Sequence, residues 1–177
     1  MATMGHIAEC RECGQRDFER DSRTLTLTVG DTAFQVKVAQ SVCRNCGEGY
    51  VDGPAIEAAE LAVAERLAES GAVTPESFRF MRQALKLRGE DLAGLLSVAA
   101  ETISRWENGK RELDRSAWVL VAEMVRDERR GGDPRMRRTL EALRKPHPLP
   151  KSVRIAGAAR VKRRAIPARR TGRKKTG

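Results

Sequence analysis

Four cysteines in two evenly spaced pairs constrain the fold of this chain more than any other feature. Cys10 and Cys13 form one C-x2-C pair, Cys43 and Cys46 form the other, and 29 residues separate the two. A C-x2-C turn directs both of its sulfurs at one point, and a glycine follows each pair, where a tight turn favours a residue without Cβ. Two such turns can close a tetrahedron, so the spacing predicts one bound Zn²⁺ with all four thiolates as ligands.

The predicted zinc is structural rather than catalytic, because four sulfur ligands leave no open coordination position. A domain of about 45 residues has too small a core to fold alone, and a metal can supply the missing stability. Disulfides and a redox C-x2-C are the alternatives, but disulfides are rare in reducing compartments and no βαβ pattern surrounds the motif. His6 and His147 lie outside the ligand spacing, and we expect both to be solvated.

The segment between the cysteine pairs alternates apolar and polar residues with the period of a β-strand. Its apolar positions, three on each side of a Gly-Asp turn, are Leu25, Leu27, Val29, Phe34, Val36 and Val38. This pattern predicts a β-hairpin with one buried face. Pro54 then suits the first turn of a helix and Gly71 its stop, so we expect a connecting helix over residues 54–70.

Short helices are expected in the next part of the chain, residues 74–143. Thr74 and Pro75 predict a helix start, and Gly89 predicts the end of that helix. Further helical segments follow as far as Arg130, and residues 133–144 could form one more.

Apolar residues at fixed offsets from Ala93 predict a helix-turn-helix in this zone. They stand one position before it and three, five, ten and thirteen after it: Leu92, Leu96, Val98, Ile103 and Trp106. Side chains of this kind let two helices cross closely, so that the second can enter a DNA major groove. Ser97 occupies the turn position where glycine is usual, and we expect some backbone strain there. Asn108 and Gly109 are expected to end the second helix.

The sequence therefore predicts an α+β fold made of two small domains and a tail. The expected boundaries are 8–52 for a zinc-binding β-hairpin domain, 53–73 for the connecting helix, 74–143 for an all-α helix-turn-helix domain and 144–177 for a disordered basic tail. Residues 144–177 carry 13 Lys and Arg and no acid, whereas residues 75–143 carry 14 Lys and Arg against 12 Asp and Glu. The tail is expected either to add non-specific phosphate affinity or only to aid solubility.

Two stretches resemble known families. "LRGEDLAGLLSVAAETISRWENGKRELDRSAW" resembles the Cro/repressor-type (Xre-type) helix-turn-helix, and the cysteine hairpin ending in "CRNCGEGY" resembles the zinc-finger half of MqsA-like (YgiT-type) antitoxins. The order, zinc domain first and helix-turn-helix second, is also the order in that family. Together the two motifs cover about residues 8–130.

This resemblance implies a homodimer that binds a palindromic operator in double-stranded DNA and represses its own operon. It also implies that the zinc domain binds a small ribonuclease toxin. The two base-reading positions of the family fall on Glu101 and Arg105. The family has Asn where this chain has Glu101. The resemblance therefore implies DNA binding, but it does not imply that this chain recognises the same DNA sequence.

The residues of the predicted recognition helix agree with this interpretation. The N-terminal half of such a helix enters the groove, which makes Ala100, Glu101 and Arg105 candidates for base contacts. Arginine can donate two hydrogen bonds to guanine, and glutamate can accept one from the amino group of cytosine. Phosphate contacts are expected from Thr102, Ser104, Lys110 and Arg111. Glu101 and Arg105 are four residues apart, so a surface ion pair is the alternative, while Ile103 and Trp106 are expected to face the core.

These features favour a transcriptional regulator that is the antitoxin of a type II pair, with a stand-alone regulator of the same build as the alternative. An enzyme is not expected, because the chain lacks an H-x-E metal motif, a Gly-rich phosphate loop and an open zinc position. An RNA-binding zinc ribbon would need more aromatic residues than Phe18, Phe34 and Tyr50. No apolar run approaches the ~20 residues of a membrane span and we find no secretory signal, so a cytoplasmic protein is expected.

Overall fold

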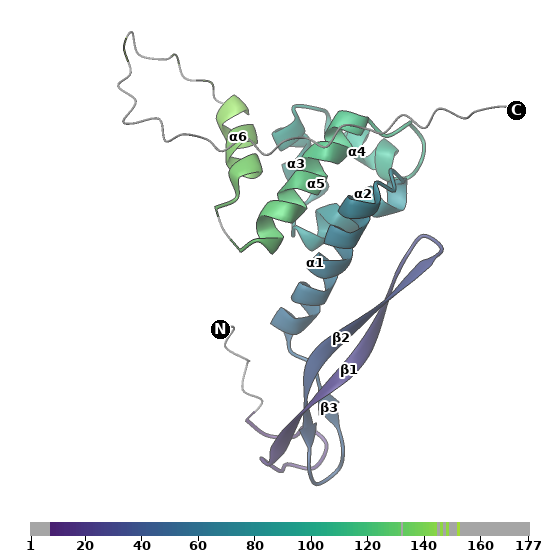
Figure 1. The fold of residues 1–177 in the computed structure, drawn as a ribbon, viewed down its shortest axis with the longest axis vertical. Coiled ribbons are helices and arrows are strands. Elements are labelled where there is room, and N and C mark those ends of the chain that lie inside the picture. Colours follow the sequence, from purple (N-terminus) through teal and green to yellow (C-terminus); the bar gives the residue numbers. More distant parts are fainter. Residues whose placement is uncertain (1–7, 132, 145, 147, 149–151, 153–177) are drawn as a thin grey trace, which may run out of the picture. The chain divides into compact units, whose positions relative to one another are not determined.

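The computed structural model describes residues 8–131, 133–144, 146, 148 and 152. These residues form an α+β fold, as predicted, with three strands followed by six helices (Figure 1). The elements are β1 (Phe18–Val29), β2 (Thr32–Cys43), β3 (Gly49–Tyr50), α1 (Gly53–Ser70), α2 (Pro75–Ala84), α3 (Gly89–Leu96), α4 (Ala100–Glu107), α5 (Arg115–Arg129) and α6 (Arg135–Arg144). His6, His147 and most of the predicted tail lie outside the described residues. Among the described helices, none combines the length and the apolar character that crossing a membrane requires.

β1 and β2 form a long antiparallel hairpin. The register runs from Phe18 opposite Cys43 to Val29 opposite Thr32, and Gly30 takes the left-handed backbone conformation that opens the two-residue turn. Buried and half-buried positions alternate with exposed ones over residues 25–29 and 34–38, which confirms the predicted hairpin and its apolar face. The strands are longer than the apolar pattern indicated. They reach the second cysteine pair itself, so strand pairing brings that pair back beside the first.

α1 contributes to two hydrophobic clusters. Val63 and Leu67 pack with Val29 of the hairpin in a small cluster, whereas Ala64 and Ala68 are part of the larger helical core. Asp52 caps the start of the helix, and its carboxylate accepts a hydrogen bond from the backbone N–H of residue 55. The helix ends before a left-handed glycine, as predicted. Because one helix serves both clusters, the hairpin is packed directly against the helical part of the chain.

The helical core is built by α1 to α6 around fully buried Phe78, Met81, Leu92, Val121 and Val125. α2 starts as predicted. The Thr74 hydroxyl accepts a hydrogen bond from the backbone N–H of Ser77, and the Ser77 hydroxyl accepts one from the backbone N–H of Thr74. A proline occupies the first turn.

The predicted end of α2 at Gly89 is wrong. α2 ends at Ala84, and Gly89 is the first residue of α3. Lys86 takes the left-handed backbone conformation, with a φ of +55°, that glycine would usually supply at a helix end. The Lys86 ammonium pairs with Glu60 and Glu57 of α1, at 2.9 and 3.7 Å. The left-handed conformation at Lys86 is therefore accompanied by a tertiary contact, and the residue types around it do not predict it.

α3 and α4 are joined by a tight turn and cross closely. Ser97 stands in the turn with a φ of +55° and a ψ of +41°, and its backbone N–H bonds to the carbonyl of Ala93, so the strain expected at this serine is present. Ile103 and Trp106 of α4 are buried, as predicted, and the Trp106 ring packs edge-to-face on Phe78 with the centroids 6.0 Å apart. α4 is thus fixed by its inner face, and its outer face remains exposed.

Candidate metal centre and nucleic-acid interface

The four cysteine sulfurs form one compact cluster. All of them lie within 4.8 Å of one another, with Cys10 Sγ 3.5 Å from Cys46 Sγ and Cys13 Sγ 3.6 Å from Cys43 Sγ. All four side chains are free thiols, so the disulfide alternative is not observed. The cluster could hold a metal ion, and a set of four soft sulfur donors suits Zn²⁺ and similar ions.

The two C-x2-C turns have the same backbone design. The N–H of Cys10 bonds to the carbonyl of Gln15 and the N–H of Gly14 bonds back to the carbonyl of Cys10, at 2.8 and 2.9 Å. The second turn repeats both bonds, from Cys43 to Glu48 and from Gly47 to Cys43, each at 2.8 Å. Gly14 and Gly47 have φ values of +72° and +77°, which residues with a Cβ rarely adopt. The glycines noted in the sequence are therefore required by the turns.

Tyr50 lies against this cluster, although no motif in the sequence marks it as part of the site. Its hydroxyl oxygen is 3.3 Å from Cys10 Sγ and accepts a hydrogen bond of 3.0 Å from the backbone N–H of Arg11. Cys10 and Cys43 are buried whereas Cys46 is exposed, so the cluster opens to solvent at Cys46.

Neighbouring groups shift the pKa values of two of the thiols in opposite directions. The hydrogen bond with Tyr50 is the largest influence at Cys10 and lowers the pKa of that thiol to about 6. At Cys46 the backbone of Glu48 lowers the pKa, but desolvation and the three other thiols together raise it to about 12. Four thiolates this close repel one another, so their full deprotonation is favoured by a bound cation.

The second candidate site is the outer face of α4. Glu101 and Arg105 project from it, and their side chains are 72 and 53% exposed. A hydrogen bond of 2.7 Å joins Arg105 Nη2 to Glu101 Oε1, so the surface ion pair expected as the alternative is present in the free protein. The N-terminal end of α4 has no side-chain cap, because Ala99 occupies the cap position. Its first backbone N–H groups are therefore open to another acceptor.

A polar cavity of about 380 Å³ lies beside this face. Ala100 and Ser104 of α4 line it together with Gly89 at the start of α3. Two arginines and two acids also line it: Arg79, Arg88, Glu90 and Glu107. Arg88 is paired with Asp91, and its hydrogen bonds lower the pKa of that carboxyl. Neither arginine follows from the helix-turn-helix pattern in the sequence, since both precede the α3–α4 pair along the chain.

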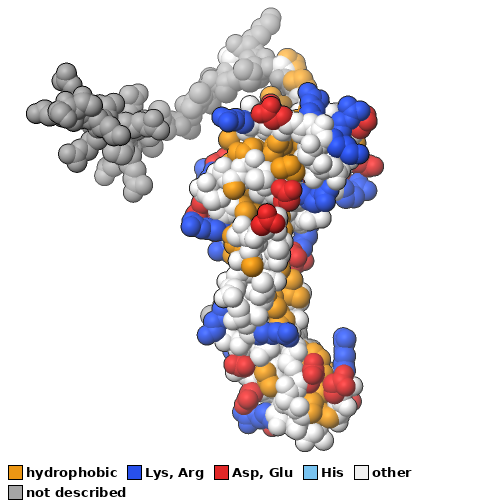
Figure 2. Space-filling view, turned by 90° about the vertical axis from the view of Figure 1, so that its right-hand side faces the viewer, with side chains coloured by type: hydrophobic (Ala, Val, Ile, Leu, Met, Phe, Trp, Pro, Cys, Tyr) orange, Lys and Arg blue, Asp and Glu red, His pale blue; other side chains and the backbone are white. Residues whose placement is uncertain are grey.

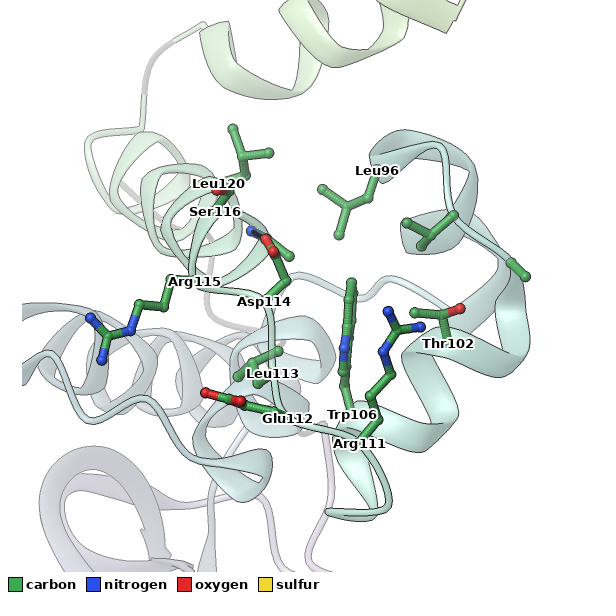
Figure 3. Close-up of a pocket in the computed structure, with 13 residues that line it drawn as sticks. Leu96, Thr102, Trp106, Arg111, Glu112, Leu113, Asp114, Arg115, Ser116 and Leu120 are labelled. Carbon is green, nitrogen blue, oxygen red and sulfur yellow. Dashed lines mark hydrogen bonds between the residues drawn. The ribbon is translucent and has the colours of Figure 1, made fainter.

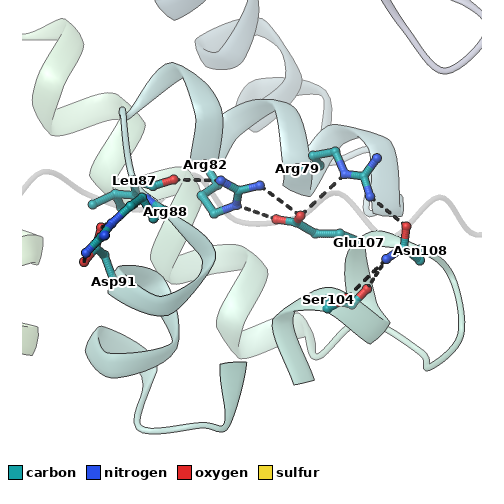
Figure 4. Close-up of polar contacts among 8 residues, drawn as sticks. All are labelled: Arg79, Arg82, Leu87, Arg88, Asp91, Ser104, Glu107 and Asn108. Atoms are coloured by element: carbon teal, nitrogen blue, oxygen red, sulfur yellow. Dashed lines mark hydrogen bonds and ion pairs between the residues drawn. The ribbon is translucent and has the colours of Figure 1, made fainter. Parts of the chain in front are cut away.

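A network of charged side chains behind the cavity ties α2 to α4 (Figure 4). Arg82 donates two hydrogen bonds to the Glu107 carboxylate, at 2.6 and 2.9 Å, and a third of 2.7 Å to the carbonyl of Leu87. Only 13% of the Arg82 side chain and 8% of the Glu107 side chain are exposed. Arg79 joins the network through Glu107 and Asn108. The network holds the position and the direction of α4 on the helical core.

An open, partly apolar groove of about 950 Å³ lies on another side of α4 (Figure 3). Leu96, Leu120 and Trp106 line it, and charged residues of the loop between α4 and α5 form its rim. Thr102 and Arg111 also border this groove. The structure thus places Ala100 and Ser104 at the polar cavity and places Thr102 and Arg111 at the groove, while Lys110 follows α4 and is exposed.

The surface of the helical part is of mixed charge. Figure 2 shows Lys and Arg side chains over this upper part of the molecule, with acidic side chains among them. This agrees with the near balance of the two signs over residues 75–143. The described surface is therefore not uniformly basic, and any affinity for nucleic acid depends on where individual cations stand.

Comparison with known proteins identifies one family. A family model described as the antitoxin component of a bacterial toxin-antitoxin system, MqsA, matches residues 8–128. Comparison with the curated proteins and with the solved structures gave no match. The matched residues include the cysteine cluster, the hairpin and the helices from α1 to nearly the end of α5, whereas α6 lies beyond them. Because the match spans more than half of the chain and both candidate sites, the chain belongs to the MqsA family of bacterial antitoxins.

Proposed function

We propose that this chain is a sequence-specific DNA-binding regulator, the antitoxin of a type II pair, which represses its own operon. The observation that supports this most is the division of α4 between two faces. Ile103 and Trp106 fix the helix on the core, whereas Glu101 and Arg105 project outward from its first two turns. A short helix presented in this way, after a tight turn from α3, suits the recognition helix of a helix-turn-helix.

In this proposal Arg105 reads guanine, and Glu101 contacts a neighbouring cytosine. Arg105 uses one terminal nitrogen for Glu101, so part of its guanidinium is still free to donate to a base edge. Ala100 lies one residue before Glu101, at the end of the helix that would enter the groove. Its small side chain would allow close approach and could contact a thymine methyl group.

Phosphate contacts are proposed on both sides of α4. Ser104, Arg79 and Arg88 surround the polar cavity, and the uncapped N–H groups of α4 lie beside it. Thr102 and Arg111 would serve on the α4 side of the groove and Lys110 after the end of α4, as predicted from the sequence. The basic segment 144–177 is proposed to add non-specific affinity, which a truncation after residue 146 would test through a weaker salt dependence of binding.

We propose that the protein acts as a homodimer and that a second copy packs against the α5 side of the groove between α4 and α5. This side carries half-buried Leu120. Arg115 and two acids, Glu112 and Asp114, also line the groove there. A two-fold axis brings the same patch against itself, so the arginine of one copy can meet an acid of the other. This face is distinct from the one with Glu101 and Arg105, and a palindromic operator would be read by two copies of α4.

The cysteine cluster is proposed to hold one structural Zn²⁺, and the domain around it to bind a small basic toxin. Residues 1–74 carry 12 acids against 7 bases, which suits a basic partner. The alternative, a stand-alone regulator with the same DNA-binding site and no toxin, shares every feature of α4. Co-expression with any small basic protein encoded beside this gene separates the two, because only an antitoxin would co-purify with it and relieve its growth inhibition.

The test of DNA binding is selection from a random double-stranded pool with the full chain as bait. We expect enrichment of a palindrome with guanine and cytosine in each half-site. The matched bait is Arg105→Ala, which leaves the buried face of α4 untouched. Enrichment of the same sequence by both baits, or of none by the parent, would contradict the proposal.

A further inference from the structure

We propose that the Tyr50 hydroxyl donates a hydrogen bond to the metal-bound thiolate of Cys10 and thereby strengthens the hold of the four-cysteine site on its metal ion. This inference rests on the proposed zinc site and adds a positioning residue to it. The Tyr50 hydroxyl oxygen is 3.3 Å from Cys10 Sγ, within the range of hydrogen bonds to sulfur. Among the four sulfur ligands, Cys10 is also one of the two that are buried.

The direction of this hydrogen bond follows from the neighbouring donor. The backbone N–H of Arg11 donates to the Tyr50 oxygen at 3.0 Å, so that oxygen already accepts a bond and its own proton is free to point elsewhere. A metal-bound thiolate has no proton and can only accept. In the loaded site the chain of hydrogen bonds must therefore run from Arg11 N–H to the Tyr50 oxygen, and from the Tyr50 hydroxyl to the Cys10 sulfur.

The fold holds Tyr50 in place for this contact. Tyr50 is one of the two residues of β3, and it pairs with Ser41 of β2. Its ring packs edge-to-face on Phe18, the first residue of β1, with the centroids 6.0 Å apart and the planes at 76°. The backbone, the ring and the hydroxyl are each fixed by a different partner. A side chain fixed in this way loses little conformational entropy when the metal binds.

The chemical effect follows from the charge of the site. Four thiolates around one divalent cation leave a net charge of −2, and a donor aimed at one sulfur offsets part of that charge. Hydrogen-bond partners of this kind orient metal ligands, and their loss typically lowers metal affinity by roughly 10–100-fold. Removal of the Tyr50 hydroxyl should therefore weaken metal binding and make the Cys10 sulfur a stronger electron donor.

The experiment uses the full chain loaded with Co²⁺, whose thiolate-to-metal charge-transfer band reports electron donation by the sulfurs. Tyr50→Phe removes only the hydroxyl and keeps the ring against Phe18. We expect the band to move to lower energy and the affinity for Zn²⁺, measured by chelator competition, to fall by roughly 10–100-fold. The matched control, Thr28→Val, removes an exposed hydroxyl at the other end of β1, opposite Ala33, and its band should stay in place.

A second variant tests the effect of a stronger hydrogen bond to the Cys10 sulfur. Tyr50 is the chain's only tyrosine, so incorporation of fluorotyrosine changes this position alone. The more acidic hydroxyl is a stronger donor and should move the band to higher energy. An unchanged band and an affinity within twofold of the parent in Tyr50→Phe would overturn the inference. If the parent itself gives no cobalt-thiolate band, the proposed metal site fails instead, and the two failures are thus distinguishable.

Discussion

Glu101 is the residue at which this chain departs from the pattern that its α4 otherwise resembles. An acid in a DNA groove faces a field of phosphates, and in the free protein this one is hydrogen-bonded to Arg105 at 2.7 Å. We propose two roles for Glu101 in DNA recognition. Its carboxylate would hold Arg105 in place on the face of α4, and it would disfavour any base that cannot donate a hydrogen bond to it.

Glu101→Gln tests this role. Loss of the negative charge should raise affinity for unrelated DNA, while the discrimination in favour of the selected site should fall by about 1–3 kcal/mol. Titration of selected and scrambled duplexes at one salt concentration measures both. Glu90→Gln, which removes an exposed acid at the polar cavity, should raise affinity for both duplexes alike. Equal discrimination by Glu101→Gln and the parent would remove the acid from the recognition mechanism.

Ser97 carries backbone strain that glycine would relieve. Its φ of +55° is unfavourable for a residue with a Cβ. We expect Ser97→Gly to raise the free energy of unfolding by about 0.5–1 kcal/mol, after allowance for the greater entropy of glycine in the unfolded chain. Chemical denaturation measures the change. Ser116→Gly, in the first turns of α5, should be destabilising, and a similar loss at Ser97 would show that the serine has a compensating contact.

At the scale of elements, the position of α4 depends on contacts that are distant in sequence. Arg82 of α2 and Glu107 of α4 form a nearly buried pair, and removal of one partner leaves the other charge buried without compensation. Because α4 has only eight residues, this pair and the buried Ile103 and Trp106 define its direction together.

Glu107→Gln should therefore lower the free energy of unfolding by about 3–5 kcal/mol. Thermal or urea unfolding of the full chain gives the difference. The control is Glu141→Gln, which breaks the exposed pair with Arg137 and should cost no more than about 0.5 kcal/mol. Comparable losses in the two variants would mean that the Arg82–Glu107 pair is not a specific support of α4.

The same elements show what the sequence could predict. The hairpin, the cysteine turns, the start of α2 and the buried face of α4 follow from local periodicity and from residues with strong conformational preferences. The end of α2 could not be predicted, because Lys86 takes a left-handed conformation and pairs with α1. Tyr50 and the pair of Arg82 with Glu107 were missed for a related reason, since their partners are brought together only by the tertiary fold.

At the scale of the whole molecule, two hydrophobic clusters of different size share α1. The hairpin cluster has three buried members, Val29, Val63 and Leu67, whereas the helical cluster is larger and spans α1 to α6. We therefore expect the hairpin end of the molecule to depend on the proposed metal for much of its stability, whereas the helical part has a core of its own.

Metal removal should destabilise the hairpin end and leave the helical part folded. In the presence of a strong chelator we expect backbone amides of β1 and β2 near Cys43 to lose protection from hydrogen exchange, while those of α5 around Val121 and Val125 retain it. Acidification should have the same effect, because protons compete with the metal for the thiolates as pH falls. Simultaneous loss of protection in α5 would show that the fold is a single cooperative unit.

The central claim, that the outer face of α4 reads DNA, is tested most directly by Arg105→Ala on the operator selected by the parent. Affinity for the operator should fall by about 1–3 kcal/mol, while affinity for scrambled DNA should change much less. Lys110→Ala, a proposed phosphate contact, should instead weaken binding to both duplexes and reduce the salt slope by about one. If Arg105→Ala binds the operator as tightly as the parent and discriminates as well against scrambled DNA, α4 is not the recognition helix.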